Sequence, residues 1–135
     1  MHQIGEVAER VGLSLRTVRY YEEMGLITPE RRTDGGFRLY TEENIERLLL
    51  IKQMKPLGFS VQEIGELIDA RDALRALDPG DPGRQQLAAE LSRFAEAADK
   101  RCRKLRGNLA AGVELAEQLS RESRQATTAP GQVRL

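Results

Sequence analysis

Few residues of this chain could hold a metal ion or form a cross-link. The 135 residues include one cysteine, Cys102, one histidine, His2, and no tryptophan. A single cysteine cannot form an intrachain disulfide, and one histidine beside it cannot complete a conventional zinc or iron–sulfur site within one chain. The sequence therefore predicts no bound metal and no cofactor.

Long apolar runs are also scarce. The longest, residues 48–51, is far shorter than the roughly 20 residues that cross a bilayer. The first residues lack the basic-then-apolar order of a secretory signal. We therefore expect a cytoplasmic protein that does not bind a membrane. A chain of this length fits one core-bearing domain, or a small domain plus an extended element.

Neither sign of charge is in excess. Lysine and arginine number 21, as do aspartate and glutamate, so the formal net charge is zero. A protein that binds nucleic acid through bulk positive charge would be basic overall. DNA binding by this chain would therefore need its basic residues to share one face.

The apolar spacing near the N-terminus indicates two short helices. The first covers residues 4–11 and ends at Gly12, because glycine readily takes the left-handed conformation that closes a helix. The second starts at Ser14, a good N-cap residue, and closes at Gly25. Two short helices joined by a tight turn predict a helix-turn-helix.

A hairpin with arginine and tyrosine on its strands is predicted next. Asp34-Gly35-Gly36 favours a tight turn with positive φ, and Arg38 and Tyr40 follow it. Together with the preceding helix, which also presents arginine and tyrosine, this hairpin suits a winged helix-turn-helix that grips duplex DNA.

Capping residues mark two more helices. Thr41 can cap the first, which ends near Pro56, and Ser60 with Glu63 forms the capping box of the second. Turn formers around residues 78–83 then predict a hinge over residues 71–82. Asp81 followed by a proline would start another helix.

This last helix carries the seam of a coiled coil. Its small and apolar residues advance by alternating steps of mostly three and four over residues 83–121, and a flexible tail is predicted over residues 122–135. One isolated helix cannot bury such a stripe, so we expect a homodimer. The residues assigned to dimerisation are Leu91, Ala98, Cys102, Leu105 and Leu109.

Two features of this helix leave alternatives open. Cys102 is interpreted as a small hydrophobic residue of the seam, or else as a thiol sensor. The basic run over residues 100–106 is interpreted as the solvated flank of the coiled coil, or else as a contact to DNA or a partner.

Four motifs occur in order along the first half of the chain. They are Ile4-Gly-Glu-Val-Ala, Thr17-Val-Arg-Tyr-Tyr-Glu-Glu-Met-Gly-Leu-Ile, Gly36-Phe-Arg-Leu-Tyr and Leu57-Gly-Phe-Ser-Val-Gln-Glu-Ile. In this order they resemble the MerR family of bacterial transcription regulators. The predicted fold is accordingly all-α with a small two-strand wing: a winged helix-turn-helix domain over residues 1–70, the hinge, and a long C-terminal dimerisation helix that pairs in antiparallel fashion in this family.

The resemblance implies that the second helix enters the major groove and that the wing lies on the flanking backbone. The DNA-binding residues that it implies are Arg16, Thr17, Arg19, Tyr20, Tyr21, Arg38, Tyr40 and Lys55. Most of these would contact phosphate, whereas Arg16 or Thr17 lies near enough to the helix N-terminus to touch base edges. The alternative is that the arginines are solvated and that Tyr20 or Tyr21 packs in the core.

The function implied by the resemblance is that of a transcriptional regulator. As a homodimer it would bind a pseudo-palindromic site in double-stranded promoter DNA and distort the promoter spacer for RNA polymerase. The alternative is an architectural DNA-binding module, or a coiled-coil protein-interaction module, without an inducer response. An enzyme is not expected, since the sequence offers no nucleophile–base pair, phosphate loop or metal-ligand set.

The effector of such a regulator is not named by the sequence. The cysteines that metal-sensing and iron–sulfur relatives use have no counterparts here. The tail after the long helix is too short for the large C-terminal domain of drug-binding relatives. The resemblance therefore excludes three known modes of sensing, and the effector stays unknown.

Overall fold

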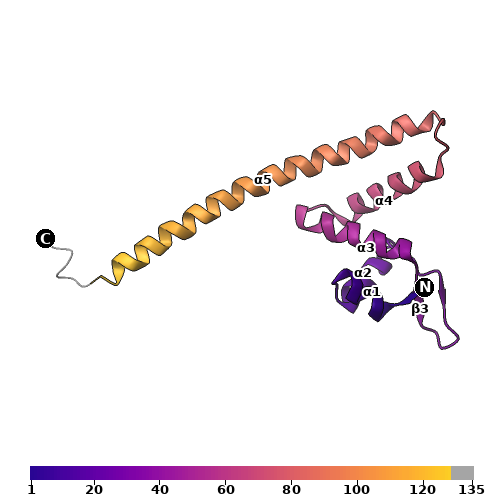
Figure 1. The fold of residues 1–135 in the computed structure, drawn as a ribbon, viewed down its shortest axis with the longest axis horizontal. Coiled ribbons are helices and arrows are strands. Elements are labelled where there is room, and N and C mark those ends of the chain that lie inside the picture. Colours follow the sequence, from indigo (N-terminus) through magenta and orange to yellow (C-terminus); the bar gives the residue numbers. More distant parts are fainter. Residues whose placement is uncertain (129–135) are drawn as a thin grey trace. The chain divides into compact units, whose positions relative to one another are not determined.

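The computed structural model describes residues 1–128, except for the side chains of Arg31 and Arg32. Most of this part of the chain is helical, and a small antiparallel sheet lies beside the first helices (Figure 1). The chain divides into two compact units, of which the first is Met1–Ala95 and the second begins at Glu96. The predicted fold class, all-α with a small wing, is confirmed.

Two short helices form the helix-turn-helix, as the sequence predicts. They are α1, Ile4–Val11, and α2, Leu15–Glu23. Gly12 ends α1 in the left-handed region at φ +70°. Ser14 caps α2, because its side-chain oxygen accepts a hydrogen bond from the backbone N–H of Thr17 at 3.0 Å.

The wing is a hairpin to which a third strand adds at one edge. The strands are β1, His2–Gln3, β2, Arg31–Arg32, and β3, Arg38–Tyr40, in the order β1-β3-β2. The turn has Gly36 at φ +83°, as predicted, and its N–H donates to the carbonyl of Thr33 at 2.8 Å. β1 was not predicted, because a two-residue strand shows no alternating pattern and forms only when β3 is beside it.

Two further helices complete the first domain. They are α3, Glu42–Met54, followed by the 3₁₀ turn η1, Lys55–Leu57, and α4, Val61–Ala76. Both predicted caps are confirmed as full capping boxes, in which Thr41 pairs with Asn44 and Ser60 with Glu63. These local bonds fix where α3 and α4 begin.

The core of the first unit is built from the apolar faces of α1 to α4, together with residues of the loop after α2 and of β3. Its largest fully buried side chains are Val7, Val11, Val18, Ile27, Tyr40, Leu48, Ile51 and Ile64. Polar contacts also cross-link the helices. Lys52 of α3 donates to the carbonyl of Val11 at the end of α1 at 2.8 Å, and Arg47 of α3 donates to Asp72 of α4 at 2.5 Å.

The structure corrects two predicted boundaries. The hinge was placed at residues 71–82, but α4 continues to Ala76 and leaves only residues 77–82 outside the helices. Arg84 caps this extension by donating to the carbonyls of Leu74 and Leu77, both at 3.0 Å. The helix after the hinge is α5, Gly83–Ala126, which runs past the predicted end at residue 121.

Side-chain pairs four residues apart support this longer end of α5. Gln118 donates to Glu122 at 3.3 Å, and Arg124 donates to Ser120 at 2.9 Å. Of the predicted tail, residues 129–135 lie outside the described residues.

Within residues 1–128, no helix has the length and apolar content needed to cross a bilayer. In the same part of the chain, no three histidine, cysteine, aspartate or glutamate side chains gather into a group that could hold a metal ion.

Candidate nucleic-acid interface

The exposed face of α2 carries two arginines and a tyrosine. Arg16, Arg19 and Tyr20 lie at the i, i+3 and i+4 positions, so one side of the helix presents all three. All three are exposed, and Tyr20 keeps 45% of its surface accessible. The opposite face is buried through Val18 and Tyr21. This distribution places the two predicted arginines of α2 on one face, an arrangement that DNA binding by a chain without net charge requires.

Two of the predicted DNA contacts belong to the core instead. Tyr21 is 7% exposed, with its ring in edge contact with that of Tyr20 at a centroid distance of 5.5 Å. Tyr40 is fully buried, and its hydroxyl donates to Oε1 of Glu22 at 2.7 Å. Burial is the main reason why the pKa of both phenols lies above its ordinary value. For Tyr21 the alternative of core packing describes the structure, whereas the burial of Tyr40 was not anticipated from the sequence.

The wing presents Arg38 and a residue that the sequence analysis did not assign. The Arg38 side chain is 37% exposed, and its Nε lies 2.8 Å from Oε2 of Glu22. Phe37 precedes it and is 64% exposed. The sequence did contain a signal for an exposed ring, because Phe37 directly follows the two glycines of the turn. A side chain at the tip of a hairpin lies far from the core and tends to stay exposed.

The remaining predicted contacts lie at helix ends. Thr17 stands in the first turn of α2, where its hydroxyl is 2.8 Å from that of Ser14. Lys55 is exposed at the start of η1, directly after α3.

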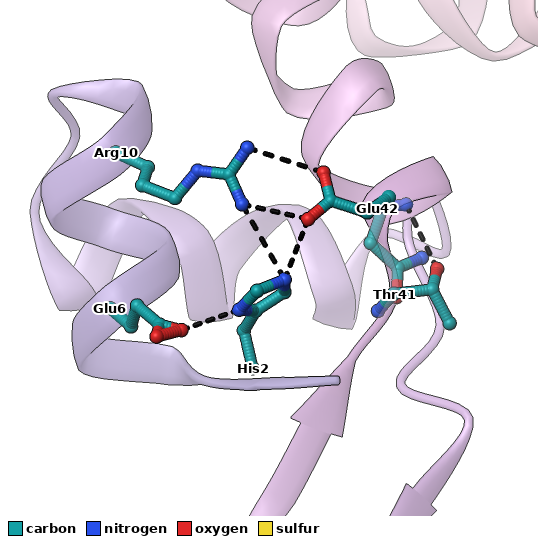
Figure 2. Close-up of polar contacts among 6 residues, drawn as sticks. His2, Glu6, Arg10, Thr41 and Glu42 are labelled. Atoms are coloured by element: carbon teal, nitrogen blue, oxygen red, sulfur yellow. Dashed lines mark hydrogen bonds and ion pairs between the residues drawn. The ribbon is translucent and has the colours of Figure 1, made fainter.

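An ionic cluster joins β1 and α1 to the start of α3 (Figure 2). The ring nitrogens of His2 face Glu6 and Glu42, with Nε2 2.7 Å from Oε1 of Glu42. Arg10 donates to both oxygens of Glu42, at 2.8 and 3.2 Å. These hydrogen bonds, first from Arg10 and then from His2, hold the pKa of Glu42 at about 2. Because β1 pairs with β3, the cluster supports the base of the wing.

The predicted seam residues lie along α5. Leu91, Ala98 and Cys102 are partly buried, while Leu105 and Leu109 are exposed. Three more large apolar side chains continue the exposed set toward the end of the helix: Val113, Leu115 and Leu119.

Comparison with family models decides the family. Residues 3–71 match the model described as MerR HTH family regulatory protein, and residues 45–121 match the one described as MerR, DNA binding. The chain belongs to the MerR family. The two models together extend from the helix-turn-helix into α5, so the family assignment covers the wing as well as most of the long helix.

Similar proteins support the MerR assignment. The chain is 43% identical over 70 residues to the mercuric resistance operon regulatory protein of Bacillus cereus, an alignment covering 52% of this chain and 53% of that protein. It is 45% identical over 71 residues to the transcriptional regulator ZntR of Escherichia coli K12, covering 53% and 50%. The chain thus spans about half the length of these curated relatives.

A solved structure shares the MerR fold. It is the structure of HiNmlR, a MerR family regulator lacking the sensor domain, bound to promoter DNA. It has a TM-score of 0.69 and 24% sequence identity, and the match covers 93% of this chain and 91% of that one. At this identity the likeness establishes the fold alone.

Proposed function

We propose that this MerR-family chain is a cytoplasmic, homodimeric transcriptional regulator that binds promoter DNA. The observation that carries the proposal is the gathering of Arg16, Arg19 and Tyr20 on the exposed face of α2, together with a wing that presents Arg38. In helix-turn-helix proteins the second helix of the motif lies in the major groove. A chain without net charge would gain its affinity for duplex DNA from this local arrangement of donors.

The proposed contacts divide by the chemistry of the groups. Arg16 and Thr17, in the first turn of α2, are assigned to base edges, where a short reach into the groove is needed. The remaining donors are assigned to phosphate oxygens, which fix the register of the protein on the duplex. These donors are Arg19, Tyr20, Arg38 and Lys55.

Tyr21 and Tyr40 are left out of the contact set because their side chains are buried. Phe37 joins it, since its exposed ring can pack against the sugar backbone beside Arg38 without supplying a hydrogen bond.

The homodimer is supported by the exposed apolar residues of α5. Leu105 and Leu109 keep much of their surface accessible in the single chain, and neighbouring seam residues continue the stripe. Fully burying one leucine side chain contributes about 1.5–3 kcal/mol to the free energy of association. The simplest partner that could cover the stripe is a second copy of α5, because most soluble oligomers are built from identical chains. Cys102 lies on this seam and is assigned to packing rather than to sensing.

Regulation is assigned to distortion of the promoter. A two-fold dimer holds two half-sites, and bending a short DNA site smoothly costs on the order of 1–6 kcal/mol. Several phosphate contacts from each copy are of the size needed to offset this cost. The distorted spacer would realign the two promoter elements that RNA polymerase recognises.

The test begins with duplexes that the full chain enriches from a random pool. We expect the pool to yield one pseudo-palindromic sequence and a dimer to bind it. Fluorescence energy transfer between labelled duplex ends should then show that the bound DNA is bent or untwisted. Failure to enrich any duplex would reject DNA binding. A bound duplex whose end-to-end distance, bent or straight, is the same with and without every effector tried would favour the architectural module instead.

A further inference from the structure

The carboxylate of Glu22 joins the recognition helix α2 to the wing strand β3. Its Oε2 lies 2.8 Å from Nε of Arg38, and its Oε1 accepts a hydrogen bond from the Tyr40 hydroxyl at 2.7 Å. The Glu22 side chain is only 15% exposed. Both of its oxygens are therefore committed to β3, although the residue itself belongs to α2.

The place of Glu22 in α2 is unfavourable for the helix itself. The residue stands in the last turn, where the unpaired carbonyl groups carry partial negative charge. A carboxylate there destabilises an isolated helix, and α2 has no basic residue in that turn to balance it. The ion pair with Arg38 and the hydrogen bond from Tyr40 compensate, so the reason for an acid at this position lies in the wing.

Arg19 and Arg38 both act electrostatically on the buried Tyr40 hydroxyl. Burial, and then the hydrogen bond to Glu22, raise the pKa of Tyr40, whereas Arg38 and Arg19 act in the opposite direction. Arg19 of α2 and Arg38 of β3 therefore both lie within electrostatic range of Tyr40. Glu22 is the group that connects their two elements.

We propose that Glu22 is a positioning residue for DNA binding, which holds Arg38 of the wing in a fixed place relative to the recognition helix. The ion pair uses Nε of Arg38 and leaves the two terminal nitrogens to donate to a phosphate oxygen. The inference rests on the proposed DNA-binding function and adds to it a residue that does not itself touch DNA.

A positioning role and a purely electrostatic role predict opposite changes in DNA affinity when the Glu22 carboxylate is removed. If charge alone mattered, removing a negative group beside the DNA backbone would strengthen binding. If Glu22 positions Arg38, removing it weakens binding, because the arginine must then be ordered at the moment of association. Glu23 is an exposed acid one residue further along α2, so Glu23→Gln is the matched control for charge.

The experiment measures affinity and salt dependence for the full chain. Wild type, Glu22→Gln, Glu23→Gln, Arg38→Ala and the double variant Glu22→Gln/Arg38→Ala are titrated onto a fluorescent duplex enriched by the wild type, at several salt concentrations. We expect Glu22→Gln to weaken binding about threefold to tenfold and Glu23→Gln to leave it equal or tighter. In the Arg38→Ala background, Glu22→Gln should have no further effect.

A Glu22→Gln affinity at or above that of wild type, or a full additional loss in the double variant, would overturn the positioning role. If Arg38→Ala leaves affinity and salt slope unchanged, the wing contact of the proposed function fails as well. If Arg38→Ala weakens binding and Glu22→Gln does not, only the positioning role fails.

Tyr40→Phe separates positioning from a general loss of structure. This variant removes the hydroxyl bond to Glu22 and keeps the Glu22–Arg38 ion pair. We expect it to lower the melting temperature with a smaller effect on DNA affinity than Glu22→Gln. Equal losses of affinity in two variants of equal melting temperature would make the role of Glu22 structural only.

Discussion

At the scale of single residues, the face of a helix decides what a side chain does. Tyr20 and Tyr21 are adjacent in sequence, yet one is 45% and the other 7% exposed, because neighbouring helical positions point about 100° apart. Arg16 and Arg19 share the exposed side with Tyr20. The proposed contacts to DNA, whether to phosphates or to base edges, therefore fall on the exposed members of the motif.

Arg19→Ala tests one of these roles. We expect the variant to bind duplexes of different sequence about threefold to tenfold more weakly and to lower the salt slope by about 1, since a phosphate donor contributes without regard to sequence. Fluorescence anisotropy over a salt series measures both quantities. Arg93→Ala, at an exposed arginine of α5, is the matched control. A salt slope equal to that of wild type would contradict the phosphate role.

The ionic cluster at the base of the wing predicts a dependence of stability on pH. The pKa of Glu42 is about 2, below the ordinary 4.5, because of its hydrogen bonds to Arg10 and then His2. A group whose pKa is lower in the folded state stabilises it fully above the unfolded value and loses this contribution as the pH falls. The stability that Glu42 provides should therefore decline between about pH 4.5 and pH 2.

Urea unfolding of wild type and Glu42→Gln at low salt checks this dependence. We expect the wild type to be the more stable protein near pH 6 and the difference to shrink as the pH is lowered through this window. Glu30→Gln, at an exposed acid in the loop before β2, should show no comparable trend. A difference that stays constant over the window would argue against the ionised cluster.

At the scale of elements, helix starts are set by a few neighbouring atoms. The Ser60 side chain accepts from the N–H of Glu63 at 3.1 Å, and a Glu63 carboxylate oxygen accepts from the N–H of Ser60 at 2.9 Å. These bonds satisfy backbone donors that the helix itself leaves unpaired. Such a start can be recognised in sequence because it depends on residues only three positions apart.

Ser60→Ala should reduce the free energy of unfolding by about 0.5–2 kcal/mol, the usual effect of losing an N-cap. Chemical denaturation of the full chain measures the change. Ser92→Ala is the control, because it also replaces a serine by alanine but at an exposed position inside α5. Since alanine is the better helix former, this variant should not be destabilised. Equal destabilisation by both variants would mean that the capping box is not the source of the effect.

At the scale of the whole molecule, α5 offers the surface that a second copy would cover. Leu105 and Leu109 are 44% and 68% exposed. A helix that stays in contact with water on all sides would carry polar residues at such positions. The proposed homodimer would bury this stripe. It would also bring two DNA-binding domains onto one site.

The double variant Leu105→Lys/Leu109→Lys tests the dimer. We expect it to raise the dimer dissociation constant at least tenfold, or about 1.4 kcal/mol, because two charged groups from each copy would enter the seam. Sedimentation equilibrium gives the constant. Gln118→Lys adds a similar charge at an exposed position off the seam and should leave association unchanged. A double variant that dimerises as well as wild type would contradict the seam assignment.

Much of the fold could be predicted because its signals are local. Gly12, Ser14, Thr41 and Ser60 each mark a helix boundary through their own backbone preference or a bond within three residues. The limits of α4 and α5 were harder. Helix propagation needs no continuing apolar stripe, and the side chain that caps the end of α4, Arg84, belongs to the next helix.

By itself the sequence determined the order of the five helices and the hairpin, the glycine turn of the wing, the family motifs and the apolar period of α5. Only the tertiary structure decided that Tyr21 and Tyr40 are core residues, that β1 joins the wing, and that Glu22 pairs with Arg38 across two elements. The physical reason is distance along the chain. Caps and turns are settled between near neighbours, whereas burial and ion pairs depend on which remote segments the packed core brings together.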